Sequence, residues 1–302
     1  MKKSIQSKKE AWLHAVRLRT LPLALASIFA GSFLAQWQGS FRWEVLLLAS
    51  LTTIFLQILS NLANDYGDSI HGADSSERKG PIRAVQSGLI SLQEMKRAMI
   101  LFGALSLGTG ILLIYLALPD WKYFLGFLAL GLAAIWAAIR YTSGKNPYGY
   151  AGLGDIFVFG FFGIVGVTGT YFLHALEAKP FILLIAFSLG CFSTVVLNIN
   201  NIRDIDSDRL AGKLSIPVRI GRMNAIRYHW ALILLGNVSL LYFVLLNQTY
   251  TPLLAFLMLP WMIQISQGIQ SATTAAETDP FLKKMALSTL IWTLLFGFGL
   301  IL

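Results

Sequence analysis

The sequence contains little cysteine, few histidines and few charged residues. Cys191 is its one cysteine, which excludes an intramolecular disulfide and any set of cysteine ligands around a metal. The four histidines show none of the spacings typical of metalloenzymes. Charged residues make up 13% of the 302 positions, about half the share found in soluble domains. The composition therefore excludes an ordinary soluble enzyme.

Basic residues exceed acidic ones, with 24 Lys and Arg against 15 Asp and Glu and a formal net charge of +9. A nucleic-acid-binding protein would display such an excess on one solvated face. Here long apolar stretches separate the basic residues, so we expect no nucleic-acid partner. The excess of positive charge needs a different explanation.

Long apolar stretches dominate the chain, and hydrophobic residues make up 56% of it. A helix needs about 20 apolar residues to cross a bilayer, and the polar segment 247–252 divides the longest apolar stretch in two. Nine spans follow, at 21–37, 45–63, 98–118, 123–139, 156–173, 181–199, 228–246, 252–270 and 285–302. The sequence predicts an all-α, polytopic membrane protein with a single domain over residues 1–302.

The distribution of basic residues predicts the orientation of these helices. With nine spans the loops alternate between two sides, and one side holds all of the 24 Lys and Arg except Arg42, Lys122 and Lys179. Lys and Arg are enriched in the cytoplasmic loops of membrane proteins. We therefore expect a multi-pass protein of the inner or plasma membrane with a cytoplasmic N-terminus and a C-terminus on the outer side.

Acidic residues gather after the second and the sixth predicted helix, in two cytoplasmic loops at about 61–90 and 198–222. If the second helix continues through Asp68, then Asn61, Asn64, Asp65 and Asp68 share one helix face. Two amides and two carboxylates would then converge at the membrane surface.

The second loop repeats this pattern. Asn200, Asp204 and Asp208 are spaced four residues apart, and the first two lie 136 positions after Asn64 and Asp68. This is a weak internal repeat of about four helices plus a loop. We expect it to place both acidic clusters on one side of the helix bundle, facing each other.

Carboxylates held this close repel each other unless a cation joins them. Hard oxygen ligands without Cys or His suit Mg²⁺, which commonly binds carboxylates together with a substrate phosphate. We therefore predict four metal ligands: Asp65, Asp68, Asp204 and Asp208. Basic residues that follow each cluster are candidates for the remaining phosphate oxygens: Arg78, Lys79, Arg83, Arg203 and Lys213. Together these residues predict a diphosphate site.

Other interpretations stay open at this point. A single acidic residue such as Asp206 is as well explained by solvation or local pairing, and we place Glu277 and Asp279 in a loop. The clusters could also serve a divalent-cation carrier or a non-catalytic binder of polyprenyl phosphate. Transport sites usually lie near the middle of the bilayer, however, and these clusters lie at its surface.

Several separate segments resemble the UbiA superfamily of intramembrane aromatic prenyltransferases, which have nine helices and two Asp-rich motifs. They are 19–22 (RTLP), 64–68 (NDYGD), 72–74 (GAD), 80–85 (GPIRAV), 141–144 (YTSG), 152–155 (GLGD) and 200–204 (NNIRD). Within the superfamily the resemblance is nearest to the 1,4-dihydroxy-2-naphthoate prenyltransferases of menaquinone synthesis. The chain departs from the general motif at Gly72, where a third Asp is often found, and at Lys145, where many relatives have glycine.

The resemblance implies an Mg²⁺-dependent enzyme, a 1,4-dihydroxy-2-naphthoate polyprenyltransferase. It would transfer the prenyl group of a polyprenyl diphosphate to the aromatic acid, with loss of CO₂ and diphosphate, giving demethylmenaquinol. The alternative in the same superfamily is a prenyltransferase for 4-hydroxybenzoate or another aromatic acid.

The resemblance also assigns roles to residues of this sequence. The amides of Asn64 and Asn200, and Lys145, would contact substrate. The ring of Tyr141 is a candidate to stabilise the allylic cation that forms when diphosphate leaves. Arg19, in a resembling segment outside both acidic clusters, is a candidate to hold the carboxylate of the aromatic acid.

Overall fold

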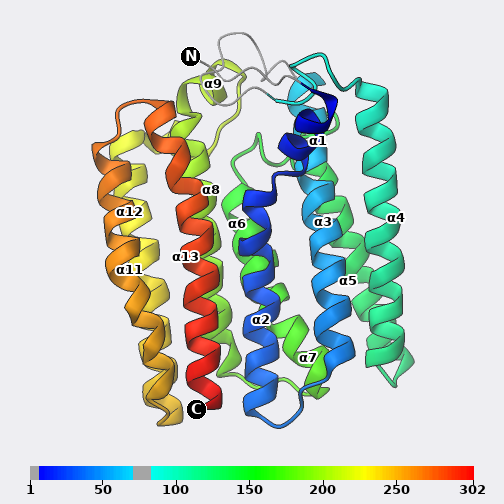
Figure 1. The fold of residues 1–302 in the computed structure, drawn as a ribbon, viewed down its shortest axis with the longest axis vertical. Helices are drawn as coiled ribbons and strands as arrows, with labels where there is room; N and C mark the ends of the chain where they lie inside the picture. Colours follow the sequence, from blue (N-terminus) through cyan, green and yellow to red (C-terminus); the bar gives the residue numbers. More distant parts are fainter. Residues whose placement is uncertain (1–6, 71–82) are drawn as a thin grey trace.

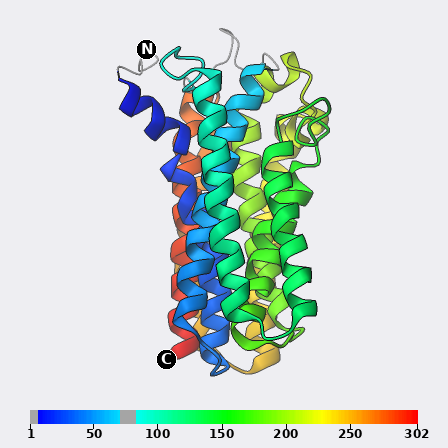
Figure 2. The ribbon, with the colours of Figure 1, turned by 90° about the vertical axis from the view of Figure 1, so that its right-hand side faces the viewer.

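The structure, a computed structural model, describes residues 7–70 and 83–302, and every regular element in these ranges is a helix. Among the described residues, nine helical segments are long and apolar enough to cross a membrane, which confirms the predicted number of spans. They run side by side along the long axis of the bundle, and the first helix lies at the opposite end of it from the C-terminus (Figure 1, Figure 2).

Five of the spans lie within residues 7–175. The elements there are α1 (Lys8–Val16), η1 (Leu18–Thr20), α2 (Leu21–Trp37), α3 (Trp43–Ile70), α4 (Leu92–Ala117), α5 (Trp121–Arg140), α6 (Gly154–Val158), η2 (Phe159–Gly169) and α7 (Thr170–Ala175). The first span combines α1, η1 and α2, and the fifth combines α6, η2 and α7.

The remaining four spans lie within residues 182–302. The elements of this part are α8 (Ile182–Arg203), α9 (Ile205–Leu210), α10 (Ile216–Ile220), α11 (Arg222–Asn247), η3 (Thr251–Met258), α12 (Leu259–Ser271) and α13 (Ala275–Ile301). We call the end of the bundle at which α3 and α8 finish, and near which α9 lies, the carboxylate end (Figure 1).

Helix α8 lies at the centre of the bundle and α5 at its edge. Helix α8 packs against α11, α13 and η2, and it carries Phe192, whose ring meets Trp292 of α13 edge to face at 5.1 Å between centroids. Half of the 20 residues of α5 are exposed, among them Trp121 and Trp136, and only Ala137 is buried, as suits a helix that faces lipid. The buried core therefore lies mainly around α8.

The fifth span contains an uncommon π-helix, η2, over Phe159–Gly169. A side chain at Gly163 would come within 2.6 Å of Gly190 in α8, and one at Gly166 within 2.8 Å of Ser27 in α2. Ser27 also donates a hydrogen bond to the carbonyl oxygen of Phe162. Small residues thus allow η2 to pack closely between α2 and α8, the usual way for membrane helices to approach each other.

Helix α13 begins earlier than predicted. Thr274 accepts a hydrogen bond from the backbone N–H of Glu277, and Glu277 reaches back to the backbone N–H of Thr274, so the two form a capping box. The prediction of a loop at Glu277 and Asp279 is wrong, because this cap starts the helix at Ala275. Asp279 consequently stands in the second turn of α13, at the carboxylate end.

Candidate active site

The first acidic cluster lies on the last turns of α3, which continues to Ile70 as predicted. Asp68 and Asn64, one turn apart, line a cavity in the bundle. Asp65 is buried beside them, and its carboxylate is paired with Arg17 at 2.6 Å and with Arg83 at 3.1 Å. Arg83 also reaches Asp68 at 2.6 Å, so this one guanidinium joins both carboxylates of the cluster.

Arg17 is a site residue that the sequence did not indicate. It has a left-handed backbone, with φ 51° and ψ 58°, which is uncommon outside glycine. This residue separates α1 from η1, and its side chain lines the cavity while it holds Asp65. No local sequence pattern signals a left-handed arginine, because the conformation is imposed by tertiary contacts.

The second acidic cluster lies where α8 passes into α9. Asp204 lies between the two helices, with φ −98° and ψ 10°. The backbone N–H of Asp208 still donates to the carbonyl oxygen of Asp204 at 2.8 Å. Asp204 and Asp208 are both buried, whereas Asp206 is exposed, as the spacing of four residues predicts.

Each carboxylate of the second cluster has a basic partner. Arg203 holds Asp204 through two hydrogen bonds, of 2.8 and 2.6 Å. Lys213 lies 3.3 Å from Asp208, whose other oxygen accepts from Ser215 at 3.2 Å. The cluster is therefore charge-paired and almost fully removed from solvent.

The two clusters meet at one site. Tyr150 donates to Asp68 at 3.0 Å, and its carbonyl oxygen accepts from the N–H of Leu214, next to Lys213, at 2.9 Å. Burial and the nearby charges of Asp204 and Asp68 raise the pKa of Asp208 against the opposing effect of Lys213. Both clusters therefore lie together at the carboxylate end, as predicted.

Lys213 is the basic residue that interacts electrostatically with carboxylates of both clusters. Burial alone would lower its pKa, but the carboxylate of Asp208, the phenol of Tyr141 and the carboxylates of Asp68 and Asp204 together raise it. Its ammonium group therefore stays charged in a site that excludes most water. A buried, permanently charged lysine beside carboxylates can exchange its partner for another anion.

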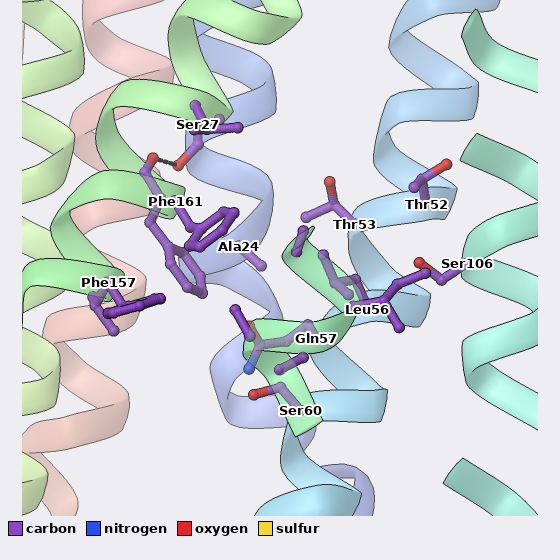
Figure 3. A pocket seen from close by; sticks show the side chains of 18 of the residues that line it. Ala24, Ser27, Thr52, Thr53, Leu56, Gln57, Ser60, Ser106, Phe157 and Phe161 are labelled. Carbon is purple, nitrogen blue, oxygen red and sulfur yellow. Dashed lines mark hydrogen bonds between the residues drawn. The ribbon is translucent and has the colours of Figure 1, made fainter. Parts of the chain in front are cut away.

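A cavity of about 380 Å³ extends from these charges into the bundle. On α3 its lining runs from Asp68 to Ala49, which corresponds to roughly 28 Å along a helix. Figure 3 shows an aromatic side formed by Phe157 and Phe161, opposite α3 residues that include Gln57. The site thus joins a charged end to a long and mainly apolar chamber.

Aromatic rings line the cavity just below the charges. Tyr141 meets Tyr148 edge to face at 5.4 Å, and Tyr148 stacks on Phe157 at 4.0 Å between centroids. Phe157 in turn stacks near Phe161 at 6.2 Å. Ring faces beside a charged site can stabilise a cation.

Comparison with known proteins agrees with this geometry. The model of the UbiA prenyltransferase family matches residues 24–300. The chain belongs to this family. It is 44% identical to an Escherichia coli protein named 1,4-dihydroxy-2-naphthoate octaprenyltransferase, over 98% of this chain and 96% of that protein. It is 35% identical to the Mycobacterium tuberculosis protein of the same name, over 94% of each chain.

Solved structures share the fold of this UbiA prenyltransferase. A UbiA homologue from Aeropyrum pernix matches with a TM-score of 0.69 and 18% identity, over 94% of this chain and 98% of that one. A homologue from Archaeoglobus fulgidus, bound to GPP and Mg²⁺, matches with a TM-score of 0.65 and 17% identity, over 96% and 99%. The predicted membership of the superfamily, with its fold, is confirmed.

The structure divides the predicted site residues of this prenyltransferase into groups. Those that line the cavity are Asn64, Asp68, Arg83, Tyr141, Asn200 and Lys213. Buried beside it, and not part of its lining, are Asp65, Asp204 and Asp208. Lys145 is exposed in the loop after α5, and Arg78 and Lys79 lie outside the described residues.

Two predicted substrate contacts face another residue instead. Arg19 and Arg203 do not belong to the described lining of the cavity, and both are paired with Asp279 of α13. The structure thus shows both guanidinium groups engaged by Asp279, and the substrate contact of Arg19 stays a prediction. Arg17, two positions earlier, does line the cavity.

The carboxylate set suits a hard divalent cation in its chemistry, because it supplies only oxygen ligands. Within residues 7–70 and 83–302 no three acidic, histidine or cysteine side chains form a ready metal centre. Asp65, Asp68, Asp204 and Asp208 are each paired with a basic side chain instead. The donor set fits Mg²⁺ provided that these ion pairs are exchanged on binding.

Proposed function

We propose that this UbiA prenyltransferase transfers a polyprenyl group from polyprenyl diphosphate to 1,4-dihydroxy-2-naphthoate, releasing CO₂ and diphosphate and giving demethylmenaquinol. The observation that carries the proposal is one cavity with a charged end and a long, mainly apolar chamber. A prenyl diphosphate has the same two parts. The acceptor is supported by relatives at 44% and 35% identity that carry the name of this activity.

The charged end suits a diphosphate that arrives with its own metal. Four carboxylates, at 65, 68, 204 and 208, face four cations, Arg17, Arg83, Arg203 and Lys213. The described site is thus close to neutral and has little attraction for a bare cation. When bound, Mg²⁺ would be held by these carboxylates and would neutralise charge that develops on the leaving diphosphate.

Arg83 and Lys213 are the basic residues best placed to bind the phosphate oxygens of the diphosphate. Both line the cavity and both are held by carboxylates that the metal would take over. Released from those partners, they would donate to phosphate oxygens, with the guanidinium able to form two parallel hydrogen bonds. Fixed positive charge at the leaving group is usually the largest contribution to such a reaction.

Bond changes in the reaction balance without a general base. The allylic C–O bond breaks with its electron pair on diphosphate, and the ring carbon that bears the carboxylate forms the new C–C bond. Loss of CO₂ then returns an electron pair to the ring and restores its aromaticity. The chain must exclude water and stabilise the cation, and the rings of Tyr141 and Tyr148 lie where they can do so.

The acceptor carboxylate needs a cation of its own, because it approaches an anionic diphosphate. Arg17 lines the cavity and is held by Asp65 alone among the described carboxylates. We assign the carboxylate contact to this residue. With the basic loops taken as cytoplasmic, the site would open at the cytoplasmic face of the inner membrane.

The proposed function is tested with the full chain in lipid nanodiscs, Mg²⁺, labelled octaprenyl diphosphate, and either 1,4-dihydroxy-2-naphthoate or 4-hydroxybenzoate. We expect a prenylated product and labelled CO₂ from carboxyl-labelled naphthoate, and no product from the benzoate. Product from the benzoate alone would contradict the acceptor assignment. Binding without any product, or Mn²⁺ flux into liposomes that needs no diphosphate, would contradict the enzyme assignment.

A further inference from the structure

Asp279 joins two arginines that the sequence had assigned to substrate. It lies in the second turn of α13, and its carboxylate accepts from Arg19 at 2.9 and 3.2 Å and from Arg203 at 2.5 Å. Arg203 continues the chain of charges to Asp204. Three separate parts of the sequence, at η1, α8 and α13, are therefore connected by one ion-pair network.

The guanidinium of Arg203 is fully engaged within this network. It is 3% exposed, its Nε and one Nη hold Asp204, and that Nη also donates to Asn200 at 2.8 Å. Its other Nη holds Asp279. Arg203 is thus divided between two carboxylates, one of which belongs to the proposed metal site.

Because Arg203 is paired with two carboxylates, Asp204 can leave it for a metal ion more easily than if it were the sole partner. A buried cation whose partner is removed is left with an uncompensated charge, which is strongly unfavourable. If Asp204 were the only carboxylate beside Arg203, it could not turn to a metal without leaving Arg203 in that state. Asp279 supplies a second carboxylate at the far side of the guanidinium, outside the described lining of the cavity.

We propose that Asp279 is a positioning residue for the metal site. It holds Arg203 when Asp204 exchanges that arginine for the divalent cation, and it touches neither metal nor substrate itself. Arg19 competes with Arg203 for the same carboxylate and so limits how strongly Asp279 draws Arg203 away. This inference rests on the proposed metal-dependent function and adds a residue that controls it.

A purely structural role for Asp279 makes a different prediction. In that case the network ties the N-terminal segment to α13, and its loss lowers thermal stability without changing metal affinity. Glu277 provides a matched control, because it caps the same helix and does not contact Arg203 or Arg19 in the described structure. Glu277→Gln should weaken the cap alone.

The test is the equilibrium binding of Mn²⁺, followed by its EPR signal, to the purified full chain in the presence of inorganic diphosphate. Asp279→Asn should weaken Mn²⁺ binding by about tenfold, since Arg203 then remains on Asp204. Glu277→Gln should bind as the unaltered protein does. Asp279→Glu, which keeps the carboxylate, should restore most of the affinity.

Two further variants keep the proposal testable even if Asp279→Asn folds poorly. In an Arg203→Gln background, Asp279→Asn should have no additional effect on Mn²⁺ binding, because no arginine is left to hold. Arg19→Gln alone should bind Mn²⁺ at least as tightly as the unaltered protein, since Asp279 then serves Arg203 only. Weaker binding by Arg19→Gln would overturn the proposal.

The results also separate this inference from the proposed function. Failure of the unaltered protein to bind Mn²⁺ with diphosphate would count against the metal-dependent function itself. Binding by the unaltered protein, with equal affinity in Asp279→Asn, would overturn the role of Asp279 alone. An equal loss in the Arg203→Gln background would show that Asp279 acts by another route and would overturn it as well.

Discussion

Each acidic cluster of the site has two buried aspartates, but the basic residues paired with them come from different places in the two clusters. At the first cluster, Arg17 and Arg83 come from outside α3, and both line the cavity. At the second, Lys213 lies on the cavity, while Arg203 is the neighbour of Asp204 in the chain and faces Asp279. In the proposed mechanism, both arginines of the first cluster can therefore contact substrate, whereas Arg203 of the second cluster stays paired with Asp279.

Removing a carboxylate from either cluster should have the largest effect, because both contribute to one metal site. We expect Asp68→Ala and Asp204→Ala to lower turnover by about a thousandfold or more while the protein still inserts and folds. Turnover at saturating Mg²⁺ measures this, with Asp206→Ala, an exposed position, as the mild control. Near-normal turnover in either variant would show that its cluster does not hold the metal.

Substitution of the basic residues that line the cavity should have the next largest effect. Arg83→Gln and Lys213→Gln each remove fixed charge from the leaving group and should lower kcat by about a hundredfold. Lys145→Gln is the control, because Lys145 is exposed in its loop. A larger loss from Lys145→Gln than from Lys213→Gln would contradict the separation of cavity cations from surface cations.

A smaller effect should distinguish the two arginines of the first span. Arg17→Gln should raise the KM for the aromatic acid by about tenfold and leave the KM for the prenyl diphosphate within about twofold. Arg19→Gln, whose side chain is held by Asp279, should change neither by more than about twofold. Steady-state assays with each substrate varied in turn decide this, and the reverse pattern would return the carboxylate contact to Arg19.

The aromatic side of the cavity should give the smallest change. Tyr148→Leu removes a ring that stacks on Phe157, and we expect kcat to fall by about tenfold, with more prenyl alcohol formed by capture of the cation by water. Tyr148→Phe keeps the ring and should retain most of the activity. Chromatography of the prenyl products measures both, and equal losses in the two variants would assign the role to the hydroxyl group.

Local spacing in the sequence predicted much of this molecule. Nine apolar stretches predicted the nine spans found among the described residues. Amides and carboxylates repeating every three or four residues predicted a shared helix face if the second helix continues through Asp68, as α3 does. The repeat at Asn200 and Asp204 placed the two clusters on one end of the bundle. These features are local, so helix periodicity is enough to find them.

Contacts between residues far apart in the chain could not be predicted from the sequence. Arg19 and Asp279 are 260 positions apart, and nothing near either residue indicates that they pair. Arg17 reaches the cavity only because its backbone is left-handed, a conformation that depends on the packing around it. The separation of α8 from α9 at Asp204 was likewise not indicated by the spacing of four residues between Asn200, Asp204 and Asp208.

The central claim is that both clusters hold one diphosphate-bound metal. A double-mutant cycle of Asp68→Asn and Asp204→Asn, read as Mn²⁺ affinity in the presence of inorganic diphosphate, tests it most directly. If the clusters share one metal site, the double variant should bind little more weakly than the weaker single variant. Losses that multiply in the double variant, as expected for two independent sites, would contradict the claim.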